Sequence, residues 1–245
     1  MNGRRTLATA KRVLQQLRHD PRTLLLIVGV PILLVTLLKY VFDDSPAIFQ
    51  QFGPIVLGLF PFTVMFIVTS ITTLRERTSG TLERLLAMPA GKLDILLGYA
   101  IAFGVMAVIQ ALAVSAVALG PLDLNIEGSV ASLVAAATLD GLLGMALGLF
   151  VSAFAETEFQ AVQFMPAVVL PQYLLCGLFI DRDQMAPLLN TISDFLPLSY
   201  SVDMIEQVAR DSAITGELVN DFLIVLAFGV GALVLGAATL RRRSA

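Results

Sequence analysis

The chain has little of what disulfide-stapled domains and metal proteins use. Of its 245 residues, one is cysteine, one is histidine and none is tryptophan. A single cysteine, Cys176, excludes a disulfide within the chain, and with His19 it leaves too few nitrogen and sulfur ligands for a structural zinc site. We therefore expect no disulfide framework and no metal site.

Motifs for nucleotide hydrolysis and for catalysis inside a membrane are lacking as well. The P-loop pattern GxxxxGK[ST] does not occur, because the one Gly-Lys pair, Gly91-Lys92, is followed by leucine and has no glycine at the required distance before it. The apolar runs contain no paired carboxylates, no histidine cluster and no serine with a base partner. The sequence predicts a chain that is not an enzyme and has no catalytic residues.

Charge is scarce, since 14% of the residues are charged and 57% are apolar. This composition is far too apolar for an ordinary soluble domain and indicates a membrane protein. Six runs are each long enough to cross hydrocarbon as a helix, which satisfies its own backbone hydrogen bonds. We expect an all-α integral membrane protein with transmembrane helices at 24–42, 53–74, 93–119, 130–154, 159–180 and 222–240.

The basic residues are distributed unevenly between the loops. Of the 16 lysine and arginine residues, all but Lys39, Arg182 and Arg210 fall before the first span, between the second and third, or after the sixth. The positive-inside rule then predicts that both termini are cytoplasmic in a bacterial inner or plasma membrane. The net charge of −3 is an average over two separated faces, and we expect no nucleic-acid partner.

Residues 1–22 precede the spans and have a helical pattern. Apolar side chains recur at spacings of three and four, and basic side chains recur every seven residues on another face. We predict an amphipathic interfacial helix whose basic residues reach lipid phosphates and which ends at Asp20-Pro21; the alternative is a basic flank without such a role. The predicted apolar stripe consists of Leu7, Ala10, Leu14 and Leu17.

Two segments between the spans are also amphipathic. In the loop 75–92, Thr78 or Ser79 is suited to cap a short helix that ends at Pro89, and this helix could lie on lipid or dock in a groove of a soluble partner. The external segment 181–221 is semi-apolar but too short and interrupted to span. It predicts re-entrant helices that are broken near 197–200 and form an external lid.

The fourth span contains the one deeply placed charge, Asp140. A charged group there is costly, so we expect a functional role in the substrate pathway, with a structural hydrogen bond to a neighbouring helix as the alternative. Three glycines follow at spacings of three and four, and they predict close helix packing: Gly141, Gly144 and Gly148.

Several motifs together resemble the ABC-2 type permease family. They are RERTSGTLERLLAMP at 75–89, PQYLLCGLF at 171–179, QMAP at 184–187 and LPLSY at 196–200. The resemblance covers nearly the whole chain in order, with a six-span plan over 23–245, and within the family it is greatest to the daunorubicin/doxorubicin exporter type. The turn 155–158 departs from the pattern of many relatives, so we assign it no function.

The resemblance implies the transmembrane permease subunit of an ATP-binding cassette exporter that moves a drug, lipid or other amphiphile outward by alternating access. Two separate ATPase subunits would hold the Mg-ATP, and a second permease copy or a paralogue would complete the transporter. The coupling residues would be Glu76, Arg77, Gly80, Thr81, Glu83 and Arg84. The second and fifth spans would line the route with Phe60, Phe62, Met65, Phe66, Phe164, Met165 and Tyr173.

One alternative concerns the class of transporter and another concerns the cargo. A stand-alone secondary transporter or channel usually has internal repeats and several charges inside the membrane, whereas this chain places only Asp140 deeply. A sugar-polymer cargo within the same family is less favoured, because sugar stacking uses aromatic faces and the chain has no tryptophan and four tyrosines. A neighbouring reading frame that encodes a P-loop protein would favour the exporter.

Overall fold

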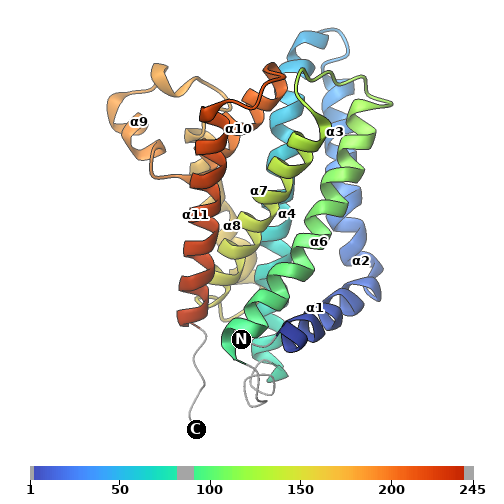
Figure 1. Cartoon of the computed structure of the whole chain (residues 1–245), viewed down its shortest axis with the longest axis vertical. Coiled ribbons are helices and arrows are strands. Elements are labelled where there is room, and N and C mark those ends of the chain that lie inside the picture. Colours follow the sequence, from blue (N-terminus) through green and yellow to red (C-terminus); the bar gives the residue numbers. More distant parts are fainter. Residues whose placement is uncertain (1–2, 82–90, 240–245) are drawn as a thin grey trace.

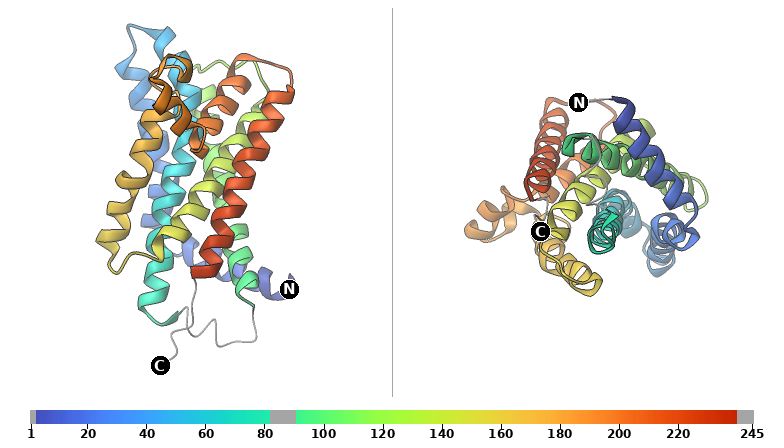
Figure 2. Two further views of the ribbon diagram at one scale, coloured as in Figure 1. Left: turned by 90° about the vertical axis from the view of Figure 1, so that its left-hand side faces the viewer. Right: turned by 90° about the horizontal axis from the view of Figure 1, so that it is seen from below.

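The computed structural model describes residues 3–81 and 91–239 and has a bundle of long helices (Figure 1). One end of the bundle carries α1 and the final turns of α4 and α11; we name it the α1 end. The opposite end, the α9 end, carries the short helices α9 and α10 (Figure 2). The elements are α1 (Gly3–Arg18), α2 (Pro21–Leu24), the π-helix η1 (Leu25–Gly29), α3 (Val30–Val41), α4 (Pro46–Thr78), α6 (Lys92–Leu119), α7 (Val130–Ser152), α8 (Glu158–Leu175), the 3-10 helix η2 (Arg182–Gln184), α9 (Pro187–Ser193), α10 (Pro197–Arg210) and α11 (Gly216–Thr239).

Five helical segments of the described chain are long and apolar enough to cross a membrane: Pro21–Val41, Pro46–Thr78, Asp94–Leu119, Val130–Ser152 and Gly216–Thr239. The prediction of an all-α membrane protein is confirmed. The expected fifth span, 159–180, is not among the five. Its helix, α8, ends at Leu175 and contains three glutamines and two prolines, so it is both shorter and less apolar than the sequence analysis expected.

The first span begins at Pro21, three residues before the predicted start at 24 and directly after the predicted end of the amphipathic helix at Asp20-Pro21. Asp20 accepts a hydrogen bond from the backbone N–H of Thr23 at 3.2 Å and from its hydroxyl at 2.6 Å, and these bonds hold the pKa of Asp20 below its usual range. Pro21 starts the helix, as its fixed φ favours. A π-helical turn, η1, precedes Pro31, whose ring would otherwise meet the carbonyl of the preceding turn.

α4 is longer at both ends than the predicted span 53–74. It runs without interruption from Pro46 to Thr78 and contains Pro54 and Pro61. Its last turn includes Arg75, Glu76 and Arg77, which the sequence analysis assigned to a loop because they are charged. These charged residues extend the helix beyond the apolar run.

α7 packs directly on the backbone of α4. A Cβ atom at Gly144 would lie 2.1 Å from the carbonyl oxygen of Phe62, and one at Gly148 would lie 2.4 Å from that of Phe66. A Cβ at Gly141 would meet Ala107 of α6 at 2.7 Å. The predicted role of these glycines in close packing is confirmed, and α4 and α7 form the centre of the bundle.

α1 lies across the end of the bundle and packs on α6 (Figure 2). The predicted helix is present, but its buried face is only partly the predicted stripe. Leu7 is 62% exposed, while Thr6, Thr9 and Val13 are buried instead. The reason is a close crossing at Gly98 of α6, where a Cβ would lie 2.6 Å from Thr9. Part of the apolar face of α1 therefore packs on α6, while Leu7 stays exposed on the outside of the bundle.

The segment between α8 and α11 forms the short helices at the α9 end (Figure 1). α9 ends at Ser193 and α10 begins at Pro197, so the break between them lies at 194–196, just before the predicted position 197–200, which forms the first turn of α10. α10 is amphipathic and packs against α4, α7 and α11. This packing makes α10 part of the bundle rather than a surface loop.

Candidate functional site

The last turn of α4 is tied to two other helices at the α1 end. Glu76 is buried, and its Oε1 lies 3.1 Å from a guanidinium nitrogen of Arg12 in α1. The same nitrogen of Arg12 donates a hydrogen bond to the hydroxyl of Tyr99 in α6 at 3.3 Å. One arginine therefore joins α1, α4 and α6 close to the end of α4, just before the predicted coupling residues Gly80 and Thr81.

The same turn of α4 also contacts the turn between α7 and α8. Arg75 pairs with both carboxylate oxygens of Glu158, at 2.7 and 2.8 Å, and Arg77 donates a hydrogen bond to the backbone carbonyl of Ala155. The paired geometry of Arg75 and Glu158 is the strong form of this interaction, although both side chains are exposed. The turn 155–158, for which the sequence predicts no function, thus links the start of α8 to the last turn of α4.

The predicted coupling residues are only partly described. Glu76 and Arg77 belong to α4, and Gly80 follows with φ +71°, a left-handed conformation that favours glycine. The hydroxyls of Thr81 and Ser79 lie 3.0 Å apart. Glu83 and Arg84 lie outside the described residues, as does most of the predicted short helix. Among the predicted coupling residues, the structure therefore describes those that attach the end of α4 to its neighbours, Glu76 and Arg77, and the two that follow, Gly80 and Thr81.

The predicted pathway residues fall into two groups. Phe62, Met65 and Phe66 are fully buried within the protomer, in the packing between α4 and its neighbouring helices. Phe62 and Phe66 are stacked, with ring centroids 6.4 Å apart. In this conformation these three side chains are not accessible from the surface of the chain, where a cargo could contact them.

The second group lies on α4 and α8 and is partly buried: Phe60, Phe164, Met165 and Tyr173. The hydroxyl of Tyr173 contacts that of Thr63 and lies 3.4 Å from the carbonyl oxygen of Leu59. These contacts fix α8 against α4 while leaving aromatic and thioether surface partly accessible.

Asp140 is fully buried in α7. Its Oδ1 accepts a hydrogen bond of 2.5 Å from the hydroxyl of Ser201 in α10, and its Oδ2 is buried without a hydrogen-bond partner. This contact is the interhelical hydrogen bond that the sequence analysis kept as the alternative for Asp140.

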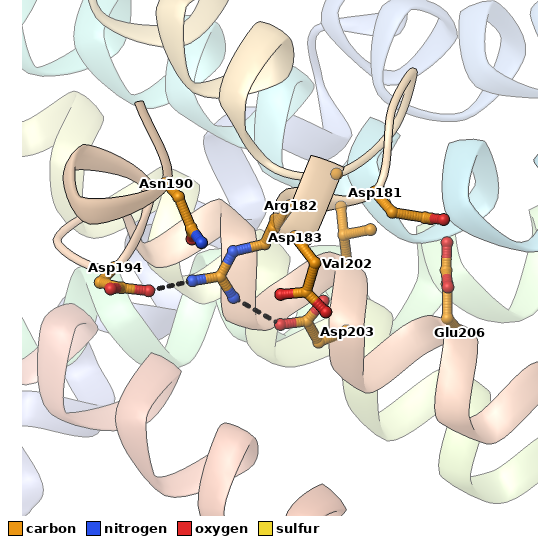
Figure 3. A pocket seen from close by; sticks show the side chains of 9 residues that line it. Asp181, Arg182, Asp183, Asn190, Asp194, Val202, Asp203 and Glu206 are labelled. Atoms are coloured by element: carbon orange, nitrogen blue, oxygen red, sulfur yellow. Dashed lines mark hydrogen bonds and ion pairs between the residues drawn. The ribbon is translucent and has the colours of Figure 1, made fainter. Parts of the chain in front are cut away.

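An acidic cavity of about 540 Å³ opens at the α9 end, and Figure 3 shows its centre. Arg182 pairs there with Asp194 and, at 2.8 Å, with Asp203, and its guanidinium lies 5.6 Å from the ring centre of Tyr200. Burial raises the pKa of Asp203 to about 6, although Arg182 lowers it. Burial also raises the pKa of Glu206. Within the described chain no cluster of three or more potential metal ligands was found.

Sequence reasoning missed the partners of these residues. No local pattern pairs Arg12, Arg75 or Glu158 with a partner, and the semi-apolar pattern of 181–221 does not distinguish Ser201. A signal existed for Arg182, since it is one of three basic residues outside the strongly basic segments. A lone basic residue among acidic ones indicates an ion pair that stabilises an external structure.

The fold is that of a multi-pass helical membrane protein, and the last turn of α4, just before the predicted coupling residues Gly80 and Thr81, is anchored to α1, α6 and the α7–α8 turn. The family model described as ABC-2 type transporter matches residues 4–209, and the chain belongs to this family.

Curated relatives are similar over parts of their length. The chain is 28% identical over 144 residues to the "Probable multidrug ABC transporter permease YbhR" of Escherichia coli (strain K12), covering 59% of this chain and 39% of that protein. It is 27% identical over 168 residues to the "Probable multidrug ABC transporter permease YbhS" (67% and 44%), and 26% identical over 180 residues to the "Inner membrane transport permease YhhJ" (73% and 48%), both of the same organism. The chain thus spans less than half the length of these relatives.

Proposed function

We propose that the chain is the transmembrane permease subunit of an ATP-binding cassette exporter, driven by separate ATPase subunits. The observation that carries the proposal is the family match over residues 4–209, together with five apolar helices that are long enough to span. The basic residues of α1 and of the last turn of α4 lie at the α1 end, which the positive-inside rule assigns to the cytoplasm. Both termini are then cytoplasmic.

The α1 end is suited to receive force from an ATPase. The loop that follows α4 carries the predicted coupling residues, and the turn before it is joined to α1, α6 and α8 by Arg12, Arg75 and Arg77. Because packed helices move as rigid bodies rather than deform continuously, a push on this loop would reach α4 and α8 together.

The proposed route for cargo runs along the face shared by α4 and α8. Phe60, Phe164, Met165 and Tyr173 are partly accessible there, and thioether and aromatic groups adapt to apolar ligands of different shapes. We include α8 as a sixth span, protected at this face by a second permease copy or a paralogue. Such burial would explain its three glutamines and two prolines, which suit a protein contact better than lipid.

The proposed cargo is a hydrophobic or amphipathic compound. The names of YbhR and YbhS carry the word multidrug, which supports this class and does not narrow it to daunorubicin or doxorubicin. α9 and α10 would cover the outer end of the route as the external lid.

The test is whether a P-loop ATPase co-purifies with this chain through the coupling loop. The variant Glu83→Ala/Arg84→Ala should lose the ATPase, because both charges lie in the predicted docking segment. A matched control is Arg22→Ala/Glu156→Ala, which likewise removes one basic and one acidic residue; these two are exposed and lie outside the predicted docking segment, so this variant should keep the partner.

Retention of the ATPase after deletion of residues 76–86 would refute docking through this loop. A native membrane extract from which the unaltered chain brings down no P-loop protein would refute the permease assignment itself.

A further inference from the structure

α10 separates two environments at the α9 end. On one face Leu198, Ser201, Val202 and Ile205 are buried against the bundle. On the other face Asp203, Glu206, Gln207 and Arg210 line a second outer cavity of about 750 Å³, which shares Asp203 and Glu206 with the acidic cavity. A movement of α10 would therefore connect the interior of the bundle with the outer aqueous side.

α10 is held in its position by close packing and by several polar contacts, among them the ion pair of Asp203 with Arg182 and a hydrogen bond of 2.8 Å from Gln207 to Asp221 in α11. At its C-terminal end the backbone N–H groups of Glu127 and Gly128 donate to the carbonyls of Ala209 and Val208, at 2.9 and 3.0 Å. In its middle, the side chain of Ile205 occupies the space above Gly58, where a Cβ would lie 2.0 Å away.

The polar contact that lies deep in the bundle is the hydrogen bond between Ser201 and Asp140. The other oxygen of this carboxylate, Oδ2, has no hydrogen-bond partner and would lie 3.7 Å from a Cβ at Gly58. A buried carboxylate that accepts a single hydrogen bond gains much from that bond, because its loss would leave the whole group unsatisfied. The bond therefore favours one placement of Ser201, and with it one placement of α10.

We propose that Asp140 is a positioning residue that holds α10 closed through Ser201, rather than a residue that contacts cargo. The inference rests on the proposed function for its meaning, since α10 is the external lid of the proposed route. The expected movement depends neither on cargo nor on the ATPase. Without the hydrogen bond between Ser201 and Asp140, α10 opens more often, while the rest of the bundle stays intact.

The test measures how fast a water-soluble thiol reagent modifies a cysteine placed at Val202. This residue is 1% exposed yet borders the acidic cavity, so a cysteine there reacts only when α10 shifts. The background is Cys176→Ser, which removes the single native cysteine. Asp140→Leu should speed the reaction by about tenfold or more, the change expected from losing one hydrogen bond to a carboxylate.

Two further variants and one control cysteine show whether a faster reaction at position 202 is due to the hydrogen bond between Asp140 and Ser201. Asp140→Asn keeps an acceptor for Ser201 and should stay near the unaltered rate. Ser201→Ala removes the donor and should act like Asp140→Leu, and it carries the test if the leucine variant fails to fold. A cysteine at Val114, buried in α6, reports general loosening and should keep its rate in all variants.

An unchanged rate at position 202 in both Asp140→Leu and Ser201→Ala would overturn the proposal. Equal acceleration at positions 114 and 202 would also overturn it, since Asp140 would then support the whole bundle. The purified chain alone suffices for these measurements, so failure to find an ATPase partner would be a separate result.

Discussion

The distance between α4 and α7 is set at single glycines. At Gly144 an added methyl group would meet the backbone of α4, which cannot move aside as a side chain could. Gly144→Ala should therefore lower the free energy of unfolding by about 1–3 kcal/mol, the usual cost of overpacking. The measurement is thermal unfolding of the purified protein in detergent.

Gly231→Ala is the matched control. A methyl group there meets nothing within 4 Å, and alanine is favoured over glycine in a helix by about 1 kcal/mol. This variant should melt at the same temperature as the unaltered protein or slightly higher. Equal melting temperatures for the two variants would show that the contact at Gly144 is not tight.

Asp203 makes the stability of the external segment depend on pH. Its pKa is about 6 in the folded protein against an ordinary value of 3.8, so the folded state binds the proton more tightly. The stabilisation is complete below about pH 3.8 and is lost as the pH rises through about 6. Its size should stay under about 1 kcal/mol, because the side chain is 38% exposed and solvent screens it.

Asp203→Asn removes this contribution. Between pH 4 and pH 7 the difference in unfolding temperature between the unaltered protein and the variant should therefore vary, with the unaltered protein relatively more stable at the acidic end. Parallel curves over this range would contradict the raised pKa. The difference curve cancels the titration of acidic groups that do not interact with Asp203, and its remaining pH dependence belongs to Asp203 and its neighbours Glu206 and Asp221.

At the scale of elements, the ion pair of Arg12 and Glu76 attaches α1 to the end of α4. Arg12→Met should destabilise the protein by about 3 kcal/mol, because it leaves Glu76 buried without its charged partner. The second substitution Glu76→Leu should recover most of this loss, since an apolar pair needs no charge partner. Unfolding measurements on both single variants and the double variant give the coupling directly.

A double variant that loses as much as the sum of the single variants would show that the two residues act independently. Arg18→Met, on the exposed face of the same helix, is the matched control for removing one positive charge from α1.

The long apolar runs of the sequence predict two of the spans closely, whereas the predicted sixth span, 222–240, begins six residues after the start of α11 at Gly216. The third and fourth spans, 93–119 and 130–154, match α6 and α7 to within two residues at each end. The errors lie where polar residues have partners that only the fold supplies. Arg75, Glu76 and Arg77 were assigned to a loop, yet contacts with α1 and with the α7–α8 turn keep them in α4.

α8 shows the opposite error. Its run of apolar residues was predicted to span up to 180, although its glutamines and prolines lower its hydropathy and it ends at Leu175. The contact between Asp140 and Ser201 was likewise missed because it joins residues that are distant in the sequence. Asp140 was recognisable as exceptional from its position in an apolar run, but its partner Ser201 is 61 residues away, and no local pattern connects the two.

At the scale of the whole molecule, the account requires that α8 crosses the membrane. In the Cys176→Ser background, a cysteine at Glu156 should react with an impermeant thiol reagent only from the cytoplasmic side, and a cysteine at Asp181 only from the outer side. Both positions are exposed and flank α8. Labelling of both from one side would show that α8 does not span and that α11 has the opposite orientation.

The central claim is that this chain provides the route and that a partner ATPase provides the energy. The most direct measurement places the purified chain in lipid vesicles, with and without the co-purified ATPase, and follows export of fluorescent hydrophobic dyes and a fluorescent phospholipid. The account predicts uphill movement only when both the ATPase and Mg-ATP are present. Uphill movement by this chain alone, driven by an ion gradient, would contradict it.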